Sequence, residues 1–567
     1  MTRYQARPRY PAIGGELERG YAPLAREIAA RRPMIVAADG PATIDWRQFS
    51  QQLRTALAGT GIELRVESTL PFVRPRGEVE QLTLAGPLRD DPVFAPIFNG
   101  ELDELMTARP KVAAGDGAVT LLTGPGAALA EHDLMWVVDH PKRIALAAVR
   151  NGRAATLSTP AGDPDGERRL MFVDWPVLDR HRRGHVSSCD RYIDLSHAAA
   201  PGSLAGEALR QSLVALAGGP FRTVPTFAPG PWGGQWLRSE LGIETDGPNL
   251  AWSYELIAPE ASVLLGEEPA LEVGFEMLLG VAGRQLLGAE VDDRFAGGFP
   301  IRFDYLDTMD GGNLSVHCHP RAEYMSEVFG WRYTQHESYY VMTATPGSHI
   351  FLGLRDQLDA EQFEAAAARS LAAAQPLDIE EFVQVHPAEQ HQLYLIPAGT
   401  PHASSAGNVV LEISATPYLY SLRFYDWLRA DLAGELRPVQ LGHAFANLNL
   451  ERRGVRVAEE LIQQPREVRR GDGFRELELG RHAELFFVVR RVEIDPGATA
   501  DDDTDGRFHV LNLVEGEAIE VATADGRSHA LAYAETLVVP ASVGRYRLRA
   551  DARGSRRVAK AYVEPVA

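Results

Sequence analysis

Cysteine and long apolar segments are both scarce in this chain. Its 567 residues include only Cys189 and Cys318, too few for a disulfide framework and typical of a protein kept in a reducing compartment. No apolar run approaches the roughly 18 residues that a membrane helix needs. The N-terminal stretch "MTRYQARPRYPAIGG" also lacks the apolar core of a signal peptide. These absences predict a soluble, cytoplasmic protein.

Positive charge is in deficit as well. The chain has 57 Lys and Arg against 77 Asp and Glu, a formal net charge of -20. Such an excess of negative charge opposes binding to nucleic-acid backbones and to anionic membranes. We therefore expect neither as a partner, and an anionic small substrate would need a locally basic pocket.

The length and the pattern along the chain indicate several domains. A chain of this size corresponds to roughly three to four domains. Strand, turn and helix signals alternate from about residue 30 to 195, as in "PMIVAADGPATIDWRQFSQQLRTALAG", which predicts an α/β layer. Pro and Gly then cluster at 218–236 in "GGPFRTVPTFAPGPWGGQW", which we interpret as a boundary.

Short alternating strands dominate from about residue 250. Examples are "SYYVMTATPGSHIFLGL" and "NVVLEISATP", whose Gly and Pro punctuation predicts a β-barrel or jelly roll. Ala-rich residues 359–374 predict a helix within it, and 441–464 a second helical stretch. The last hundred residues return to strands, with a hairpin at the "ADG" turn. We expect domains at 1–217, 218–464 and 465–567: an α/β layer and two jelly-roll barrels, the first with a helical insertion.

Metal-capable side chains recur in the first predicted barrel. In "LSVHCH", strand alternation places His317 and His319 on one face and Cys318 on the other. Glu337 follows in "QHESYYV", and His402 in "IPAGTPHA". Imidazoles with one carboxylate suit zinc or another first-row metal. Each residue alone is equally compatible with an ordinary polar position on a half-buried strand.

Several separated motifs resemble those of the type I phosphomannose isomerases, which are cupin enzymes. They are "PWGGQWLRSELG", "NLSVHCHP", "TQHESYYV", "IPAGTPHA" and "LEISATPYLYSLRFYDWLR", in the family's order over roughly residues 225–567. The resemblance implies two cupin barrels, the second without metal ligands. It also implies one Zn²⁺ per chain and interconversion of mannose 6-phosphate and fructose 6-phosphate through a cis-enediol. The preceding α/β region resembles a longer bacterial subset of these isomerases.

The resemblance also implies a set of site residues. The metal ligands are His317, His319, Glu337 and His402, with His317 standing where the family has Gln. Glu412 is the expected base or proton shuttle, and Arg423 the expected catalytic arginine. Ser315 and Arg429 are the expected substrate contacts. Each has a structural alternative: Glu412 as a carboxylate that only holds a ligand histidine, and Arg423 as a rim arginine.

Departures from the family pattern keep other functions open. Gln335 replaces a lysine two residues before Glu337, and Arg321 replaces an acidic residue after the His-Pro pair. These changes favour either a non-catalytic sugar-phosphate sensor or assembly protein, or an isomerase of a different sugar. The N-terminal region loosely resembles a uridine-kinase-like layer. Its "VAADGPATIDW" turn lacks the Gly-Lys-Ser/Thr ending of a phosphate loop, which predicts a non-catalytic domain. The sequence leaves the oligomeric state open.

Overall fold

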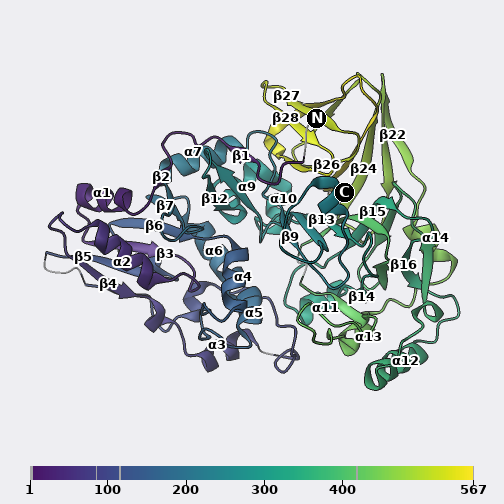
Figure 1. Cartoon of the computed structure of the whole chain (residues 1–567), viewed down its shortest axis with the longest axis horizontal. Helices are drawn as coiled ribbons and strands as arrows, with labels where there is room; N and C mark the ends of the chain where they lie inside the picture. Colours follow the sequence, from purple (N-terminus) through teal and green to yellow (C-terminus); the bar gives the residue numbers. More distant parts are fainter. Residues whose placement is uncertain (1–3, 85, 114–116, 417–418, 566–567) are drawn as a thin grey trace.

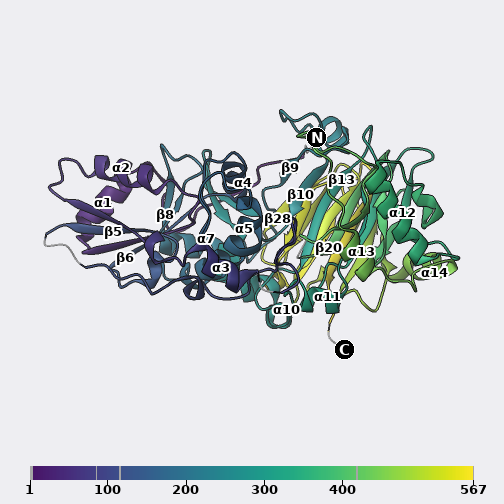
Figure 2. The same cartoon turned by 90° about the horizontal axis from the view of Figure 1, so that it is seen from below.

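The structure is a computed structural model that describes residues 4–84, 86–113, 117–416 and 419–565. Figure 1 shows an α/β part beside a larger part rich in strands, which confirms the mixed architecture. Figure 2, turned by 90°, shows the same two parts side by side. Over the described ranges, no helix is both long and apolar enough to cross a membrane.

The N-terminal part contains a seven-stranded sheet. In spatial order its strands are β2 (Glu18–Arg19), β8 (Gly202–Ala205), β7 (Arg191–Asp194), β6 (Leu134–Asp139), β3 (Ile35–Asp39), β5 (Val119–Gly124) and β4 (Leu64–Ser68). The five strands from β7 to β4 are parallel, and β8 and β2 are antiparallel additions. Strands such as β5 and β6 are buried along their whole length, as expected for a parallel sheet covered on both faces.

Helices follow these strands, which confirms the predicted alternation. They are α1 (Ala22–Arg31), α2 (Trp46–Ala56), α3 (Arg76–Thr83), α4 (Lys142–Arg150), α5 (Gly166–Arg169), α6 (Trp175–His185) and α7 (Gly206–Leu216). Helix α2 begins where Asp45 caps it by accepting a hydrogen bond from the backbone N–H of Gln48. The Gly-containing turn before α2 therefore initiates a helix, as predicted.

Two antiparallel sheets form what we call the first barrel. One contains β18 (Leu393–Ile396), β15 (Glu337–Ala344), β20 (Asn408–Ala415), β13 (Ile301–Asp307), β10 (Trp252–Leu256) and β9 (Thr226–Ala228). The other contains β17 (Val383–Pro387), β16 (His349–Leu354), β19 (His402–Ser404), β14 (Val316–Cys318) and β21 (Leu422–Tyr425). The predicted helix is α12 (Ala360–Ala373), and the helical stretch near 441–464 is two short helices, α13 (Leu441–Asn447) and α14 (Val455–Leu461). A further short helix is α11 (Ala322–Glu327).

Two more antiparallel sheets form the second barrel, drawn in yellow and yellow-green in Figure 1. One contains β22 (Arg466–Gly471), β23 (Phe474–Gly480), β24 (Phe487–Ile494), β31 (Arg556–Val563), β26 (His509–Glu515) and β29 (Thr536–Val539). The other contains β25 (Thr499–Asp503), β30 (Arg545–Arg549), β27 (Ala518–Thr523) and β28 (Ser528–Ala532). The antiparallel β27–β28 pair confirms the predicted hairpin.

A connecting region lies between the α/β part and the barrels. It contains a small sheet of β1 (Arg9–Tyr10), β11 (Ser262–Leu265) and β12 (Leu271–Gly274), with helices α8 (Trp236–Leu241), α9 (Phe275–Leu287) and α10 (Ala289–Phe295). Aromatic contacts continue through this region. The ring centroid of Phe275 lies 5.4 Å from that of Phe299, and the ring centroid of Phe299 lies 4.2 Å from that of Phe508 in the second barrel. The barrels and the connecting region therefore share one apolar core.

The N-terminal segment, residues 4–13, joins distant parts of the chain. The Tyr4 hydroxyl donates a hydrogen bond to Glu255 (2.5 Å), and the backbone N–H of Gln5 donates one to Glu535 in the second barrel (2.7 Å). Glu535 also pairs with the buried Arg222 of the connecting region. The first residues of the chain thus complete a charged contact between the connecting region and the second barrel.

Candidate metal centre

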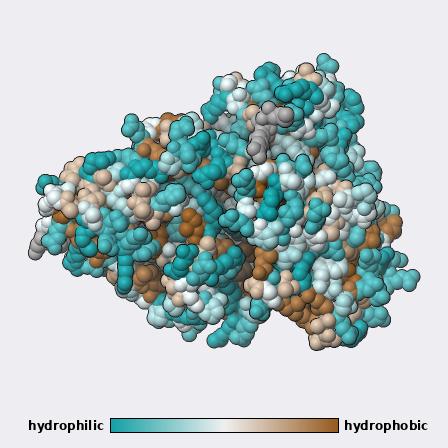
Figure 3. All heavy atoms as spheres, in the orientation of Figure 1, coloured by the Kyte–Doolittle hydropathy of each residue, from teal (hydrophilic) through white to brown (hydrophobic). Residues whose placement is uncertain are grey.

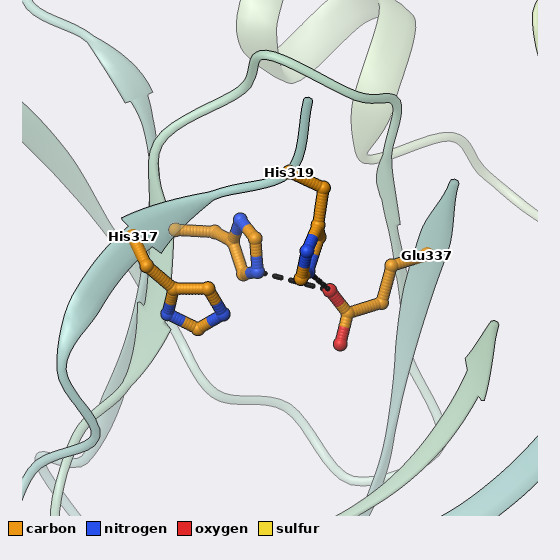
Figure 4. A group of neighbouring side chains, drawn as sticks. His317, His319 and Glu337 are labelled. Atoms are coloured by element: carbon orange, nitrogen blue, oxygen red, sulfur yellow. Dashed lines mark hydrogen bonds and ion pairs between the residues drawn. The ribbon is translucent and has the colours of Figure 1, made fainter. Parts of the chain in front are cut away.

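Four side chains from three strands and a loop meet inside the first barrel. His317 on β14 is paired with His402 on β19, and His319 follows directly after β14. Glu337 begins β15 in the facing sheet. One potential ligand atom from each of the four lies within 4.8 Å of all the others, and all four residues are buried. Figure 4 shows His317, His319 and Glu337 directed toward one another. Cys318 is not part of this group, and its Sγ lies near the carbonyl oxygen of Ala444 (3.8 Å).

Backbone carbonyl groups fix the same tautomer on all three imidazoles. Nδ1 of His317 lies 2.8 Å from the carbonyl of Ser315, Nδ1 of His319 lies 3.2 Å from that of Tyr420, and Nδ1 of His402 lies 2.9 Å from that of Thr400. Because a carbonyl oxygen can only accept, each Nδ1 must carry the proton of the bond. In the neutral ring, each Nε2 is then a lone-pair donor, as in metal-binding histidines.

The charges at the centre suit a shared cation, either a proton or a metal ion. Nε2 of His319 and Nε2 of His402 lie 2.7 and 3.0 Å from the same carboxylate oxygen of Glu337. Burial lowers the pKa values of His317 and His319, which favours their neutral forms. Burial alone would raise the pKa of Glu337, but His402 and His319 hold it well below its usual range. Lone pairs and a carboxylate oxygen this close repel each other unless a proton or a metal ion lies between them, so this donor set fits a metal ion.

A second buried charge network stands beside these ligands. Glu412 on β20 is paired with Asp304 on β13 and with Tyr339 on β15, so the three side chains share one face. Arg302 pairs with Glu412 and, through Nε, with Asp304 (2.9 Å). Burial raises the pKa values of Asp304 and Glu412, although Arg302 opposes this. Sequence reasoning missed Arg302 and Asp304. Their signal was a pair of charges two residues apart within the apolar strand "FPIRFDYLD".

A cavity of about 160 Å³ opens onto both groups. Ser315, Gln335, Glu412 and Arg423 line it together with three of the candidate ligands, His317, His319 and Glu337. Arg423 is placed there by pairing of its backbone with His317 across β21 and β14. Burial, together with the neighbouring Arg437, lowers the pKa of Arg423 to about 10. The cavity is therefore lined by both carboxylates and guanidinium groups.

Of the residues predicted to contact substrate, Arg429 lies away from the cavity, whereas the unpredicted Arg437 lines it. Arg429 is not among the described residues that line the cavity; it donates hydrogen bonds to the carbonyl of Asn313 (2.6 Å) and to Asp426. Arg437 does line it, and donates to the same Asp426 (2.8 Å). The Arg321 side chain is exposed, near the carbonyl of Ala446 (3.3 Å). Arg437 lies eight residues after the end of the "SLRFYDWLR" stretch and gave no sequence signal.

Tyr420 links the metal centre to the N-terminal part. Its carbonyl oxygen is the one that holds His319, and its hydroxyl donates a hydrogen bond to the carbonyl of Ala95 (2.8 Å). Its ring stacks on Phe329 at 3.9 Å. Nearby, His443 lies 2.8 Å from Asp91, so residues 91–98 of the α/β part pack directly on the first barrel.

Strand β3 ends in an acidic residue, Asp39, beside the turn where a phosphate loop would offer backbone N–H groups. Asp39 accepts a hydrogen bond from the N–H of Ala128 (2.8 Å) and lies 3.0 Å from Nε2 of His181. Burial would raise the pKa of Asp39, but His181 outweighs it and the pKa is lowered. An ionised carboxylate there opposes phosphate binding, in agreement with the missing Gly-Lys-Ser/Thr ending.

The comparisons with known proteins each cover only part of the chain. A family model described as "Domain of unknown function (DUF8485)" matches residues 20–218. No curated protein matches the chain. Among solved structures, the mannose 6-phosphate isomerase from Bacillus subtilis is similar at 18% identity and a TM-score of 0.48, covering 61% of this chain and 100% of that one. A mutant of phosphomannose isomerase from Salmonella typhimurium is similar at 18% identity and a TM-score of 0.46, with 61% and 100% coverage. Likeness at this level does not identify an activity, which has to be argued from the site itself.

Proposed function

We propose that the protein is a zinc-dependent aldose–ketose isomerase that interconverts mannose 6-phosphate and fructose 6-phosphate. One observation carries the proposal: three imidazoles with Nδ1 held by carbonyls converge with Glu337 in a cavity that Glu412 also lines. The motif order over roughly residues 225–567 supports the same reaction, through its resemblance to type I phosphomannose isomerases.

The donor set suits one zinc ion per chain, held by His317, His319, Glu337 and His402. When bound, such an ion would polarise the substrate carbonyl. Glu412 is placed to carry the proton between C1 and C2, because its carboxylate lies in the same cavity with Arg302 fixing its orientation. The ion pair with Arg302 also limits the movement of the Glu412 carboxylate. Each proton that Glu412 takes up or releases therefore changes the charge of this buried network.

The phosphate anchor we propose is the pair Arg423 and Arg437, since both guanidinium groups line the cavity and can bind a phosphate through paired hydrogen bonds. Ser315 is proposed to contact a sugar hydroxyl from the same wall. We assign Arg429 to positioning, because it holds Asp426, which in turn binds Arg437. We propose residues 1–217 as a non-catalytic domain that packs on the isomerase barrels, with 218–464 catalytic and 465–567 carrying the second barrel, in a cytoplasmic enzyme.

Gln335 favours a second candidate, a sugar-phosphate sensor without turnover. This amide lines the cavity where the resembling enzymes have a lysine, so one positive charge that could bind phosphate or assist proton transfer is missing. In that case the metal and the arginines would still bind the ligand. Turnover therefore distinguishes the two candidates, whereas binding does not.

A coupled assay with mannose 6-phosphate tests the proposal on the full chain. We expect turnover that chelation removes and added zinc restores. No turnover by the metal-loaded protein, together with saturable binding of mannose 6-phosphate, would support the sensor, and turnover of free mannose only would indicate a different sugar substrate.

Metal analysis tests the ligand set independently. His319→Ala and His402→Ala are expected to lose bound metal, whereas the matched control His349→Ala is expected to retain it. His349 is half-buried on β16 of the same barrel and lies outside the group. Unchanged metal content in both ligand variants would refute the proposed centre.

A further inference from the structure

The second barrel contains a cavity of about 1200 Å³ that plays no part in the proposed reaction. One half of the barrel interior is apolar, with Val492, Leu511 and Val558 among its buried core. Arg490, His509 and Lys560 each lie two residues from one of these apolar residues on the same strand. Because side chains two residues apart share a strand face, they also point into the barrel. The interior thus changes from apolar to charged toward one end, where the cavity lies.

The charged end is a buried, connected network. Lys560 is almost fully buried, with Nζ 2.7 Å from Glu476 and 2.6 Å from Asp502. Arg469 lies 2.8 Å from Glu476, and Arg490 lies 3.4 Å from it. Over the whole lining of the cavity, eight Lys and Arg side chains stand against six Asp and Glu side chains, a local excess of positive charge in a chain whose net charge is -20. Burying charged groups costs free energy, and clusters of them in a cavity are candidate functional sites.

His509 adds an unused acceptor to this wall. It is only 4% exposed, and its Nδ1 lies 2.8 Å from the hydroxyl of Tyr546. That hydroxyl lies 3.1 Å from Asp502. Burial would raise the pKa of Asp502, but Lys560 outweighs burial and the pKa is lowered, so the carboxyl is ionised. An ionised carboxylate can only accept, so the Tyr546 hydroxyl donates to it. The hydroxyl oxygen therefore accepts from Nδ1–H of His509, and Nε2 is left as an acceptor without a partner among the described residues.

We propose that this cavity is a second binding site, for a small phosphorylated sugar or sugar alcohol. The guanidinium groups of Arg469 and Arg490 match a phosphate. Glu476, Asp502 and Nε2 of His509 act as hydrogen-bond acceptors, so they favour a ligand with several hydroxyl donors, such as a sugar, over a phosphate ion. Tyr562 also lines the cavity and offers a ring face, with Arg490 5.3 Å from its centroid. Mouths of β-barrels are frequent ligand sites, and Figure 3 shows mainly hydrophilic residues over the second barrel on the face in view.

Sorbitol 6-phosphate is a suitable probe, because an open-chain sugar alcohol has no carbonyl group for an isomerase to convert. Calorimetric titration of the full chain carrying His319→Ala, His402→Ala and Arg423→Gln removes two proposed metal ligands and one arginine of the proposed phosphate anchor, so that binding in the first barrel does not mask the second site. We expect saturable binding of about one equivalent, with inorganic phosphate and sorbitol each binding more weakly. Because this variant is inactive under the proposed function in any case, the result is independent of whether that function is correct.

Two variants locate the binding. Arg490→Gln is expected to weaken it about tenfold or more, the usual loss for one hydrogen bond to a charged group. His509→Phe keeps the ring volume and removes Nε2, and it too should weaken binding. The matched control is Arg475→Gln, which removes the same charge from an exposed arginine on the outer face of β23, paired with Glu493. Absence of saturable binding, or equal affinity in all three variants, would overturn the proposal. Equal binding of inorganic phosphate and sorbitol 6-phosphate would also overturn it, because the site would then recognise phosphate alone.

Discussion

Replacing Arg302 by methionine leaves Asp304 and Glu412 without the cation that pairs with both. The three side chains are buried, with exposed fractions of 7% for Arg302, 0% for Asp304 and 3% for Glu412. Water therefore cannot take over the charges, and the apolar methionine offers neither carboxylate a hydrogen bond. We expect the variant to lose about 3–5 kcal/mol of unfolding free energy, the usual cost of removing one partner from a buried ion pair.

Urea denaturation followed by tryptophan fluorescence measures this loss, because Trp232 and Trp252 line the same cavity. Arg302→Lys is the first control: it keeps the charge but not the forked geometry, and should cost less than methionine. Arg475→Met is the second, since it breaks an exposed pair with Glu493 and should cost about 0–1 kcal/mol. If Arg302→Met and Arg475→Met are equally stable, the Arg302 network does not stabilise the barrel.

Two further perturbations test other parts of the chain. Burial raises the pKa of Asp174 to about 7, although Arg169 opposes it, so the folded chain binds a proton that the unfolded chain releases near pH 4, and stability falls between pH 4 and 7. Asp174→Asn should therefore raise the free energy of unfolding at pH 8 by up to about 4 kcal/mol, measured as a higher melting temperature, and should raise it less at pH 5. An equal gain at both pH values would contradict this pKa. Tyr420→Phe removes the hydrogen bond to Ala95 but keeps the carbonyl that holds His319. Hydrogen exchange in residues 91–98 should accelerate while metal content stays constant, and lost metal would show that the hydroxyl also positions the ligand.

The local periodicity of the chain predicted much of the candidate site. Alternation alone placed His317 and His319 on one face with Cys318 opposite, and the structure brings both histidines together with Glu337 and His402. Glu337 and His402 could be grouped with them only through the motif resemblance, because strand pairing across so many residues is not encoded locally. The roles of Glu412, Arg423, Ser315 and Arg429 remain predictions.

The missed features share a physical reason. Arg302 and Asp304 alternate with apolar residues exactly as solvent-facing positions would, and only the pairing of β13 with β20 places them inside the barrel. Helices α9 and α10 were not predicted because the surrounding strands suggested one continuous β region. The second barrel lacked a metal-like pattern, so its interior charges, which lie on five different strands, gave no sequence signal.

The N-terminal segment has a consequence for synthesis on the ribosome. Tyr4 and Gln5 are translated before their partners Glu255 and Glu535, which lie about 250 and 530 residues later in the chain. Domains generally fold in order from the N-terminus during translation. Tyr4 and Gln5 therefore stay without this full set of partners until the second barrel has been made. The docking of this segment can occur only in a chain whose translation has passed Glu535, so it is a late step in the assembly of the fold.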